Sequence, residues 1–173
     1  GVAGYTIPFA GGFWLNNPNY EVAAQAGNAV NNGLFRLSNG TFNQGTLISH
    51  SFRGGAGALF TIEGGILNCA AQFSPQSAVI YNQSAGTVNV GLVGNSQSNF
   101  ATFELFSTTA TFTMSGGTIN IVQASTGATQ IDYQNRAVST VTGGTVNIGT
   151  AATVTKFTYN IRGTLPNLVI DNT

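Results

Sequence analysis

The sequence has few charged residues, a single cysteine and no long hydrophobic run. Only 6% of its 173 residues are charged, and five Lys and Arg residues balance five Asp and Glu residues. Binding to nucleic acid or to an anionic membrane surface needs clustered Lys and Arg side chains, so the composition argues against both partners. No apolar stretch approaches the roughly 18 residues of a transmembrane helix, which predicts that the chain has no membrane span.

The lone cysteine, Cys69, excludes a disulfide framework and a cysteine-based metal site within the chain. The 42% of hydrophobic residues supply enough material for one domain with a sizeable core. The sequence starts at Gly1 without a leader segment, and residues 169–173 resemble a strand that has been cut short. We therefore expect an excerpt of a longer, processed protein that continues on both sides.

A short unit that begins with glycine recurs along the chain. In most copies Thr, an apolar residue and Asn follow the glycine, and the copies are Gly40–Asn43, Gly65–Asn68, Gly86–Asn89, Gly117–Asn120 and Gly144–Asn147. The leading glycines are unequally spaced along the chain, which predicts insertions between otherwise equivalent segments. A degenerate earlier copy is expected at Gly11–Asn16.

Apolar and polar residues alternate on both sides of each of these glycines, which is the pattern of a half-buried strand. Phe112 and Met114 precede Gly117, for example, and Ile119 and Ile121 follow it. Each unit is therefore predicted to be a strand, a glycine turn and a second strand, all with one apolar face. Helix signals are nearly absent, and the best candidate, residues 21–26, would form a single turn.

We predict an all-β fold, a right-handed parallel β-helix (β-solenoid) with about 20–30 residues per coil. Equivalent residues of successive coils then lie over one another in columns on the outer face. The predicted columns are Thr41, Thr87, Thr118 and Thr145, and Asn43, Asn68, Asn89, Asn120 and Asn147. Residues 1–33 are expected to form an irregular first coil or cap, and residues 34–173 the regular coils of one segment. The alternative is an all-β sandwich, whose strands need not share one motif in one register.

Four stretches carry a resemblance to a known group of proteins: Gly11–Asn19, Ile62–Gly65, Phe112–Asn120 and Gly163–Val169. They resemble very large β-helical repeat proteins that Bacteroidota export through the type IX secretion system. The resemblance spans nearly the whole chain and implies a right-handed parallel β-helix in a secreted or cell-surface, adhesin-like protein. It implies adjoining coils of the same polypeptide as partners, and the secretion machinery as a partner in transit. Such cargo usually carries a C-terminal sorting domain, and none is visible here.

Candidate catalytic residues are sparse. A polysaccharide-cleaving β-helix needs clustered carboxylates on one exposed face, and the chain has Glu21, Glu63, Glu104, Asp132 and Asp171. Glu104 and Asp132 are separated in the sequence by the length of one coil, and they become near neighbours if Phe103 stacks on Ile131. The preferred interpretation is two exposed carboxylates that lie apart in solvent. His50 has no carboxylate near it in the sequence to complete a triad, so we expect an exposed strand or loop residue.

Several other residues are candidates for binding or for packing. Aromatic and amide side chains that suit a sugar platform are Phe13, Trp14, Tyr20, Asn16, Asn17 and Asn19, although the preferred interpretation packs Trp14 inward as part of a cap. The outer Thr and Asn columns suit ice binding only if the coils have constant length, and the unequal spacing of the glycines argues against that. Cys69 is expected to be a small buried hydrophobe. The basic residues are scattered and expected only to solubilise the surface: Arg36, Arg53, Arg136, Lys156 and Arg162.

The sequence thus predicts a non-enzymatic, adhesin-like structural segment of a secreted or cell-surface bacterial protein. It predicts no catalytic residue, no cofactor and no metal site. The first alternative is a carbohydrate-binding or carbohydrate-cleaving β-helix with a surface polysaccharide as partner. The second alternative is an array that binds ice or another surface through the Thr and Asn columns.

Overall fold

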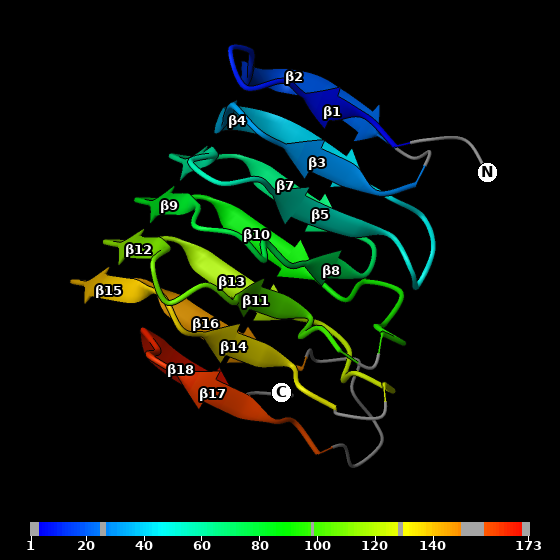
Figure 1. The fold of residues 1–173 in the computed structure, drawn as a ribbon, viewed down its shortest axis with the longest axis vertical. Helices are drawn as coiled ribbons and strands as arrows, with labels where there is room; N and C mark the ends of the chain where they lie inside the picture. Colours follow the sequence, from blue (N-terminus) through cyan, green and yellow to red (C-terminus); the bar gives the residue numbers. More distant parts are fainter. Residues whose placement is uncertain (1–3, 25–26, 98, 128–129, 150–157, 171–173) are drawn as a thin grey trace.

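A computed structural model describes residues 4–24, 27–97, 99–127, 130–149 and 158–170. These residues form an all-β parallel solenoid of about six turns, with about 25 residues per turn and no helix. The coils are stacked from the N-terminal end to the C-terminal end of the molecule (Figure 1). The β-solenoid predicted from the glycine-led repeat is confirmed, because every strand pair joins successive coils in parallel. The right hand of the winding stays a prediction.

The strands belong to two sheets. One sheet takes one strand from each coil: β1 (Thr6–Ile7), β3 (Ala29–Asn31), β5 (Ser51–Gly54), β8 (Gln72–Phe73), β11 (Phe103–Leu105), β14 (Tyr133–Asn135) and β17 (Ile161–Gly163). The other sheet forks at β4 (Leu34–Gln44), which also pairs with β2 (Gly12–Ala24).

The fork divides the second sheet into two limbs. The first limb continues from β4 through β6 (Leu59–Ile62), β9 (Ile80–Gln83), β12 (Thr111–Met114) and β15 (Val138–Val141). The second limb continues through β7 (Ile66–Cys69), β10 (Thr87–Val90), β13 (Thr118–Ile121), β16 (Thr145–Ile148) and β18 (Asn167–Ile170). A full coil therefore has three sides: a strand of the seven-stranded sheet, then the first limb, then the second limb.

The glycine of each unit forms the corner between the two limbs. Gly117 has a φ of +79°, and a Cβ at this position would lie 2.5 Å from the carbonyl oxygen of Ala85 in the preceding coil. A side chain is therefore disfavoured twice, by the left-handed backbone and by contact with the neighbouring coil. The recurrence of glycine in the sequence follows from this corner.

Buried columns run through the interior of the solenoid. In the second limb one column consists of Phe42, Leu67, Val88, Ile119 and Val146, all buried and paired in register. In the seven-stranded sheet, aromatic rings stack between coils: the centroids of Phe73 and Phe103 lie 5.3 Å apart, and those of Phe103 and Tyr133 lie 5.4 Å apart. Each coil thus buries its apolar face against the next, which a single coil could not do alone.

The structure of the first coil differs from two predictions made from the sequence. Residues 21–24 lie in β2, where Val22 pairs with Phe42, so the helical turn expected at 21–26 is wrong for the described part of that stretch. Gly12 pairs with Leu34 and not with Gly40, so Gly11–Asn16 is not an earlier copy of the unit. The strand register is interrupted between Asn16 and Glu21, where residues 17–20 take the place of the corner glycine.

Candidate functional site

The outer face of the second limb carries a continuous column of asparagine side chains. Each Nδ2 donates a hydrogen bond to the Oδ1 of the preceding coil, at distances between 2.7 and 2.9 Å. We call this set the Asn column: Asn43, Asn68, Asn89, Asn120 and Asn147. The predicted asparagine column is confirmed, and its hydrogen bonds all point toward the N-terminal coil.

A carboxylate ends the column at its N-terminal side. The Nδ2 of Asn43 donates to the Oε1 of Glu21 at 2.6 Å. The position in β2 that pairs with Asn43 is Ala23, so the longer side chain of Glu21 reaches the column from two residues away. Aligned amides polarise one another and leave their donor end positive, as at a helix N-terminus, and a carboxylate stabilises that end. The role of Glu21 was missed from the sequence because the residue of the first coil that pairs with Asn43 is an alanine.

The threonine column lies on the same outer side. Thr87, Thr118 and Thr145 are paired in register and half-buried, as predicted. The column is interrupted in β7, where Ile66 pairs with Thr41 and is exposed. The outer face therefore presents a mixed row of hydroxyl and aliphatic side chains beside the Asn column.

The register of the seven-stranded sheet corrects the expected pairing of Glu104 with Asp132. Phe103 pairs with Tyr133 and not with Ile131, so Gln134 and not Asp132 lies beside Glu104. The number of residues from Glu104 to its neighbour in the next coil was misjudged, because the connection that follows the strand is shorter in the later coil. β12 begins six residues after β11 ends, whereas β15 begins three residues after β14 ends. The corner glycines of these two coils are therefore closer together in the sequence than Phe103 and Tyr133 are.

Both carboxylates are buried, so the expectation of exposed side chains is wrong as well. Glu104 is 1% exposed and Asp132 is fully buried. The Nε2 of Gln76 donates to Oε2 of Glu104 at 2.5 Å. The backbone amides of Ser125 and Asn160 donate to the two oxygens of Asp132 at 2.6 and 2.7 Å. Burial raises the pKa of both carboxyl groups, because removal from water disfavours the charged form.

Two long connections contact polar residues of the seven-stranded sheet or next to it, such as Gln72 and Asp132, and we call this region the loop-covered face. The described parts of these connections, 91–97 with 99–102 and 122–127 with 130–132, meet at a parallel bridge between Asn95 and Ser125. Asn95 also accepts a hydrogen bond from buried Gln72 and donates one to the hydroxyl of Thr102. The polar side chains of this face are thereby removed from solvent and paired with each other.

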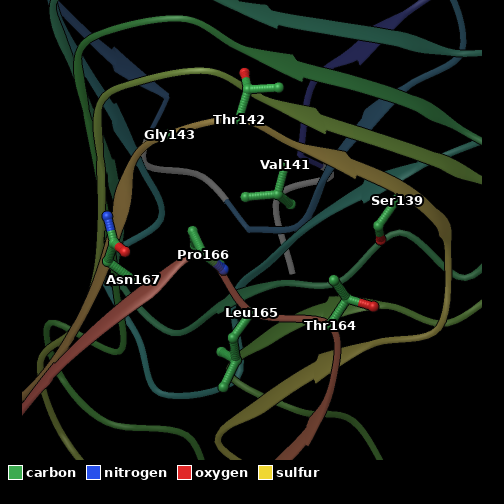
Figure 2. A pocket seen from close by; sticks show the side chains of 8 residues that line it. All are labelled: Ser139, Val141, Thr142, Gly143, Thr164, Leu165, Pro166 and Asn167. Carbon is green, nitrogen blue, oxygen red and sulfur yellow. The ribbon is translucent and has the colours of Figure 1, made fainter.

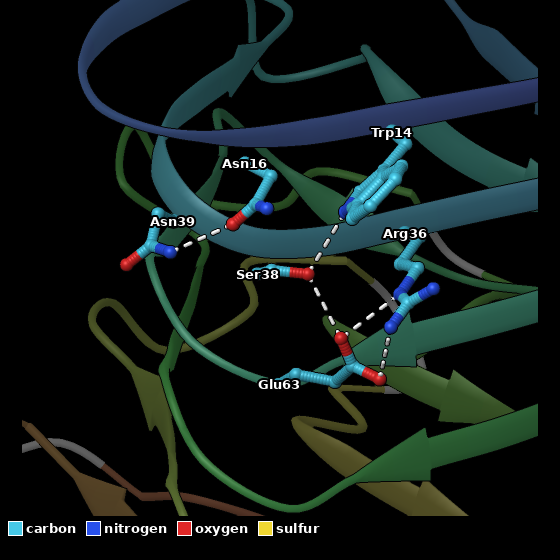
Figure 3. Close-up of polar contacts among 6 residues, drawn as sticks. All are labelled: Trp14, Asn16, Arg36, Ser38, Asn39 and Glu63. Carbon is cyan, nitrogen blue, oxygen red and sulfur yellow. Dashed lines mark hydrogen bonds and ion pairs between the residues drawn. The ribbon is translucent and has the colours of Figure 1, made fainter.

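An exposed cluster of polar side chains surrounds Trp14, which lies in β2 (Figure 3). Trp14 points outward and is 58% exposed, so the inward packing preferred from the sequence is wrong. The residue that enters the core is Phe13, whose ring stacks on Phe35. The guanidinium of Arg36 lies 4.7 Å from the centre of the Trp14 ring, and the indole Nε1 donates to the Ser38 hydroxyl at 2.9 Å.

Glu63 completes this cluster. It accepts hydrogen bonds from Nε and Nη2 of Arg36, at 2.9 and 3.0 Å, and from the Ser38 hydroxyl at 2.8 Å. These hydrogen bonds, first from Arg36 and then from Ser38, lower the pKa of Glu63. Asn39 donates to Asn16 at 2.8 Å beside them. The cluster is therefore a neutral surface in which an indole, two amides and an ion pair are held in fixed positions.

The remaining residues considered in the sequence analysis make contacts within the fold. The Nδ1 of His50 accepts the backbone amides of Thr46 and Leu47, which closes the turn before β5. Cys69 is fully buried, as expected, and burial raises the pKa of its thiol. Arg53 and Arg136 lie over aromatic rings, so they do more than solubilise the surface. Lys156 and Asp171 lie outside the described residues.

Within the described ranges no group of three or more His, Cys, Asp or Glu side chains is placed to hold a metal ion. The same residues include no helix that is long and apolar enough to cross a membrane. The described residues therefore form a parallel β-solenoid whose outer face carries one regular column of side chains, the Asn column. Comparisons with protein-family models, with curated proteins and with solved structures give no match.

Proposed function

We propose that this chain is a non-enzymatic structural segment, an adhesin-like spacer in a secreted or cell-surface bacterial protein exported by the type IX secretion system. The observation that carries the proposal is the Asn column, which joins five successive coils by the same hydrogen bond. A load applied at one end of the solenoid is then shared by many equivalent contacts between neighbouring coils. This arrangement suits reach and presentation at a cell surface.

The carboxylates support a non-catalytic role. Each of the four described ones already serves as an acceptor within the fold. Glu21 binds the Asn column, Glu63 binds Arg36, Glu104 binds a glutamine, and Asp132 binds two backbone amides. The two that were candidates for acid–base catalysis are buried, so a polysaccharide would not reach them.

Surface proteolysis of intact cells tests this proposal. In the bacterium that makes the protein, an antibody against the solenoid should label intact cells or the medium, and added protease should remove the surface signal. A strain without the type IX translocon should retain the protein inside the cell. Protection from protease in the wild-type strain, or unchanged export in the mutant, would contradict the proposal.

A second function, binding of a neutral polysaccharide, is favoured by the exposed indole of Trp14. Aromatic rings flanked by amides suit sugar rings, and here Asn16 and Asn39 lie beside Trp14 (Figure 3). Arg36 is already paired with Glu63, so the cluster offers no free cation for an acidic sugar. We therefore expect preference for uncharged glycans over uronic acids.

A glycan array with the full chain tests this second function. Binding to neutral glycans should be lost in the Trp14→Ala variant. The matched control is Phe9→Ala, which removes another exposed aromatic residue of the first coil and should leave binding unchanged. An array without hits, or equal losses in the two variants, would remove the polysaccharide function and leave the structural one untouched.

A further inference from the structure

One imidazole holds the turn between β4 and β5, residues 45–50, which we call the His50 turn. His50 is the single histidine of the sequence. Its Nδ1 accepts the backbone amides of Thr46 and Leu47, at 3.0 and 3.3 Å, and its ring packs over Gly45, where an added Cβ would lie 3.1 Å from Nδ1. Only a neutral imidazole can accept hydrogen bonds at Nδ1, because protonation turns both ring nitrogens into donors. The observed turn therefore requires an uncharged His50.

The two ends of the His50 turn are fixed independently of the imidazole. At one end the amide of Gly45 donates to the carbonyl oxygen of Ala24 in the preceding coil, at 2.9 Å. At the other end the amide and the hydroxyl of Ser51 donate to Oδ1 of Asn28, at 2.8 and 3.0 Å. Residues 46–49 between these anchors are exposed. Loss of the hydrogen bonds to Nδ1 thus releases the middle of the turn and leaves β4 and β5 in their sheets.

A positive charge on His50 finds no partner among the described residues. The charged side chains on the adjacent strands are already engaged: Glu21 accepts a hydrogen bond from the Asn column, and Arg53 lies over the ring of Phe100. Cys69 on β7 is fully buried, and burial raises the pKa of its thiol, which keeps it neutral in acid. Residues 91–97, which pack against the turn, include no charged residue. Protonation is therefore opposed by the closed turn and is not offset by a carboxylate beside it.

The His50 turn also forms part of a hollow of about 310 Å³ between the turn and the connection that follows β10. The lining residues from these two segments are Gly45, Thr46, Leu92 and Val93. The side chain of Ile48 reaches across to the connection, since a Cβ on Gly94 would lie 3.5 Å from its Cδ1. This hollow lies between coils that are covered on both sides, because β4 pairs with β2 and β7, and β10 pairs with β7 and β13. The hollow of about 610 Å³ beside β15 lies instead at an edge to which a further coil can add (Figure 2).

We propose that the His50 turn is an acid-sensitive element of the fold, in which protonation of His50 releases residues 46–49 and opens the hollow between the turn and the connection after β10. The closed turn binds only the neutral imidazole, so acid favours the open turn. Closure is complete above the pH range in which histidine titrates and is lost as the pH falls through that range. The surrounding coils stay folded, because the anchors at Gly45 and Ser51 do not involve the imidazole. This element goes beyond the structural role and does not depend on it.

Nuclear magnetic resonance of the full chain between about pH 8 and about pH 5 tests the proposal. At the higher pH the nitrogen shifts of His50 should show the proton on Nε2 and an accepting Nδ1. In acid, the protection of the Thr46 and Leu47 amides from hydrogen exchange, corrected for the intrinsic rate at each pH, should fall at least about tenfold. The contact between Ile48 and Gly94 should disappear from the Overhauser spectrum. The amide of Thr118, which donates to Gly86 in the second limb, is the internal control and should keep its protection.

Two variants separate the acceptor from the charge. His50→Asn offers an amide oxygen near the position of Nδ1 and cannot titrate, so Thr46 and Leu47 should stay protected at both pH values. His50→Phe keeps a ring without an acceptor, and both amides should exchange rapidly at both pH values.

Four results would overturn the proposal, and the first two need only the wild-type chain. One is unchanged protection of Thr46 and Leu47 while the imidazole titrates, and another is a contact between Ile48 and Gly94 that persists in acid. The third is loss of Thr118 protection together with the turn, which would mean general acid unfolding. The fourth is an equal acid response in His50→Asn, which would assign it to the carboxyl groups whose pKa burial raises, Glu104 and Asp132.

Discussion

On the outer face of the second limb each coil repeats the hydrogen bond of the coil before it, whereas on the loop-covered face the two buried carboxylates have different partners. Along the Asn column the same amide hydrogen bond recurs at 2.7 to 2.9 Å. On the loop-covered face Gln76 binds Glu104, and Asp132 binds two backbone amides from separate segments. Both faces belong to the same coils.

The difference lies in how much each contact matters by itself. The asparagines are half-buried, so water can replace part of a lost hydrogen bond, and the remaining bonds of the column stay in place. Asp132 is fully buried, and its loss leaves two backbone donors without a partner in a place that water does not reach freely. We infer that stability is distributed on the regular face and concentrated at single residues on the irregular one.

Replacement of Asp132 should produce the largest effect. Asp132→Ala leaves the amides of Ser125 and Asn160 unpaired, and we expect a loss of about 2–4 kcal/mol in the free energy of unfolding. Denaturant titration measures the loss, and amide hydrogen exchange should become faster at Ser125 and Asn160 first. A loss smaller than that caused by removing an asparagine from the Asn column would reverse the proposed contrast between the two faces.

Replacement within the Asn column should cost less and should depend on position. Asn89→Ala removes two hydrogen bonds, to Asn68 and from Asn120, and should cost about 1–2 kcal/mol. Asn147→Ala is the matched control, because Asn147 donates to Asn120 and the next residue in its column is Val169. We expect about half the loss by the same titration. Equal losses would show that the column does not act through its hydrogen bonds.

The regular face was predictable because one structural requirement recurs in the sequence. The corner needs glycine, and the following strand places an apolar residue inward and Asn outward, so the order Gly-Thr-apolar-Asn fixes the register. The pairing of Asn89 with Asn120 follows directly from that order. The cap by Glu21 could not be found in this way, because in the first coil residues 17–20 take the place of the glycine and an alanine pairs with Asn43.

The irregular face was not predictable because its register depends on connection lengths that no motif marks. The pairing of Phe103 with Tyr133 differs by two residues from the pairing with Ile131 expected from the sequence. Burial of Glu104 was also missed, since a carboxylate in an alternating strand is normally expected on the solvent side. It is buried and accepts a hydrogen bond from Gln76, and this contact joins residues that are 28 positions apart in the sequence.

The pH dependence of stability should distinguish Glu104 from Glu63 and is the smallest effect we expect. Burial raises the pKa of Glu104, whereas hydrogen bonds from Arg36 and Ser38 lower the pKa of Glu63 from the same ordinary value of 4.5. The contribution of Glu104 is therefore complete below pH 4.5 and is lost as the pH rises through its folded-state pKa. The contribution of Glu63 is present above pH 4.5 and is lost as the pH falls through its folded-state pKa.

The free energy of unfolding, measured from acidic to neutral pH, tests this difference with two matched variants. Relative to the wild type, Glu104→Gln should gain stability as the pH rises, and Glu63→Gln should lose it. The second change should stay below about 1 kcal/mol, since its ion pair is partly exposed to solvent. Curves of the same sign for both variants would mean that Glu104 is solvated in solution and not buried beside Gln76 as the structure describes.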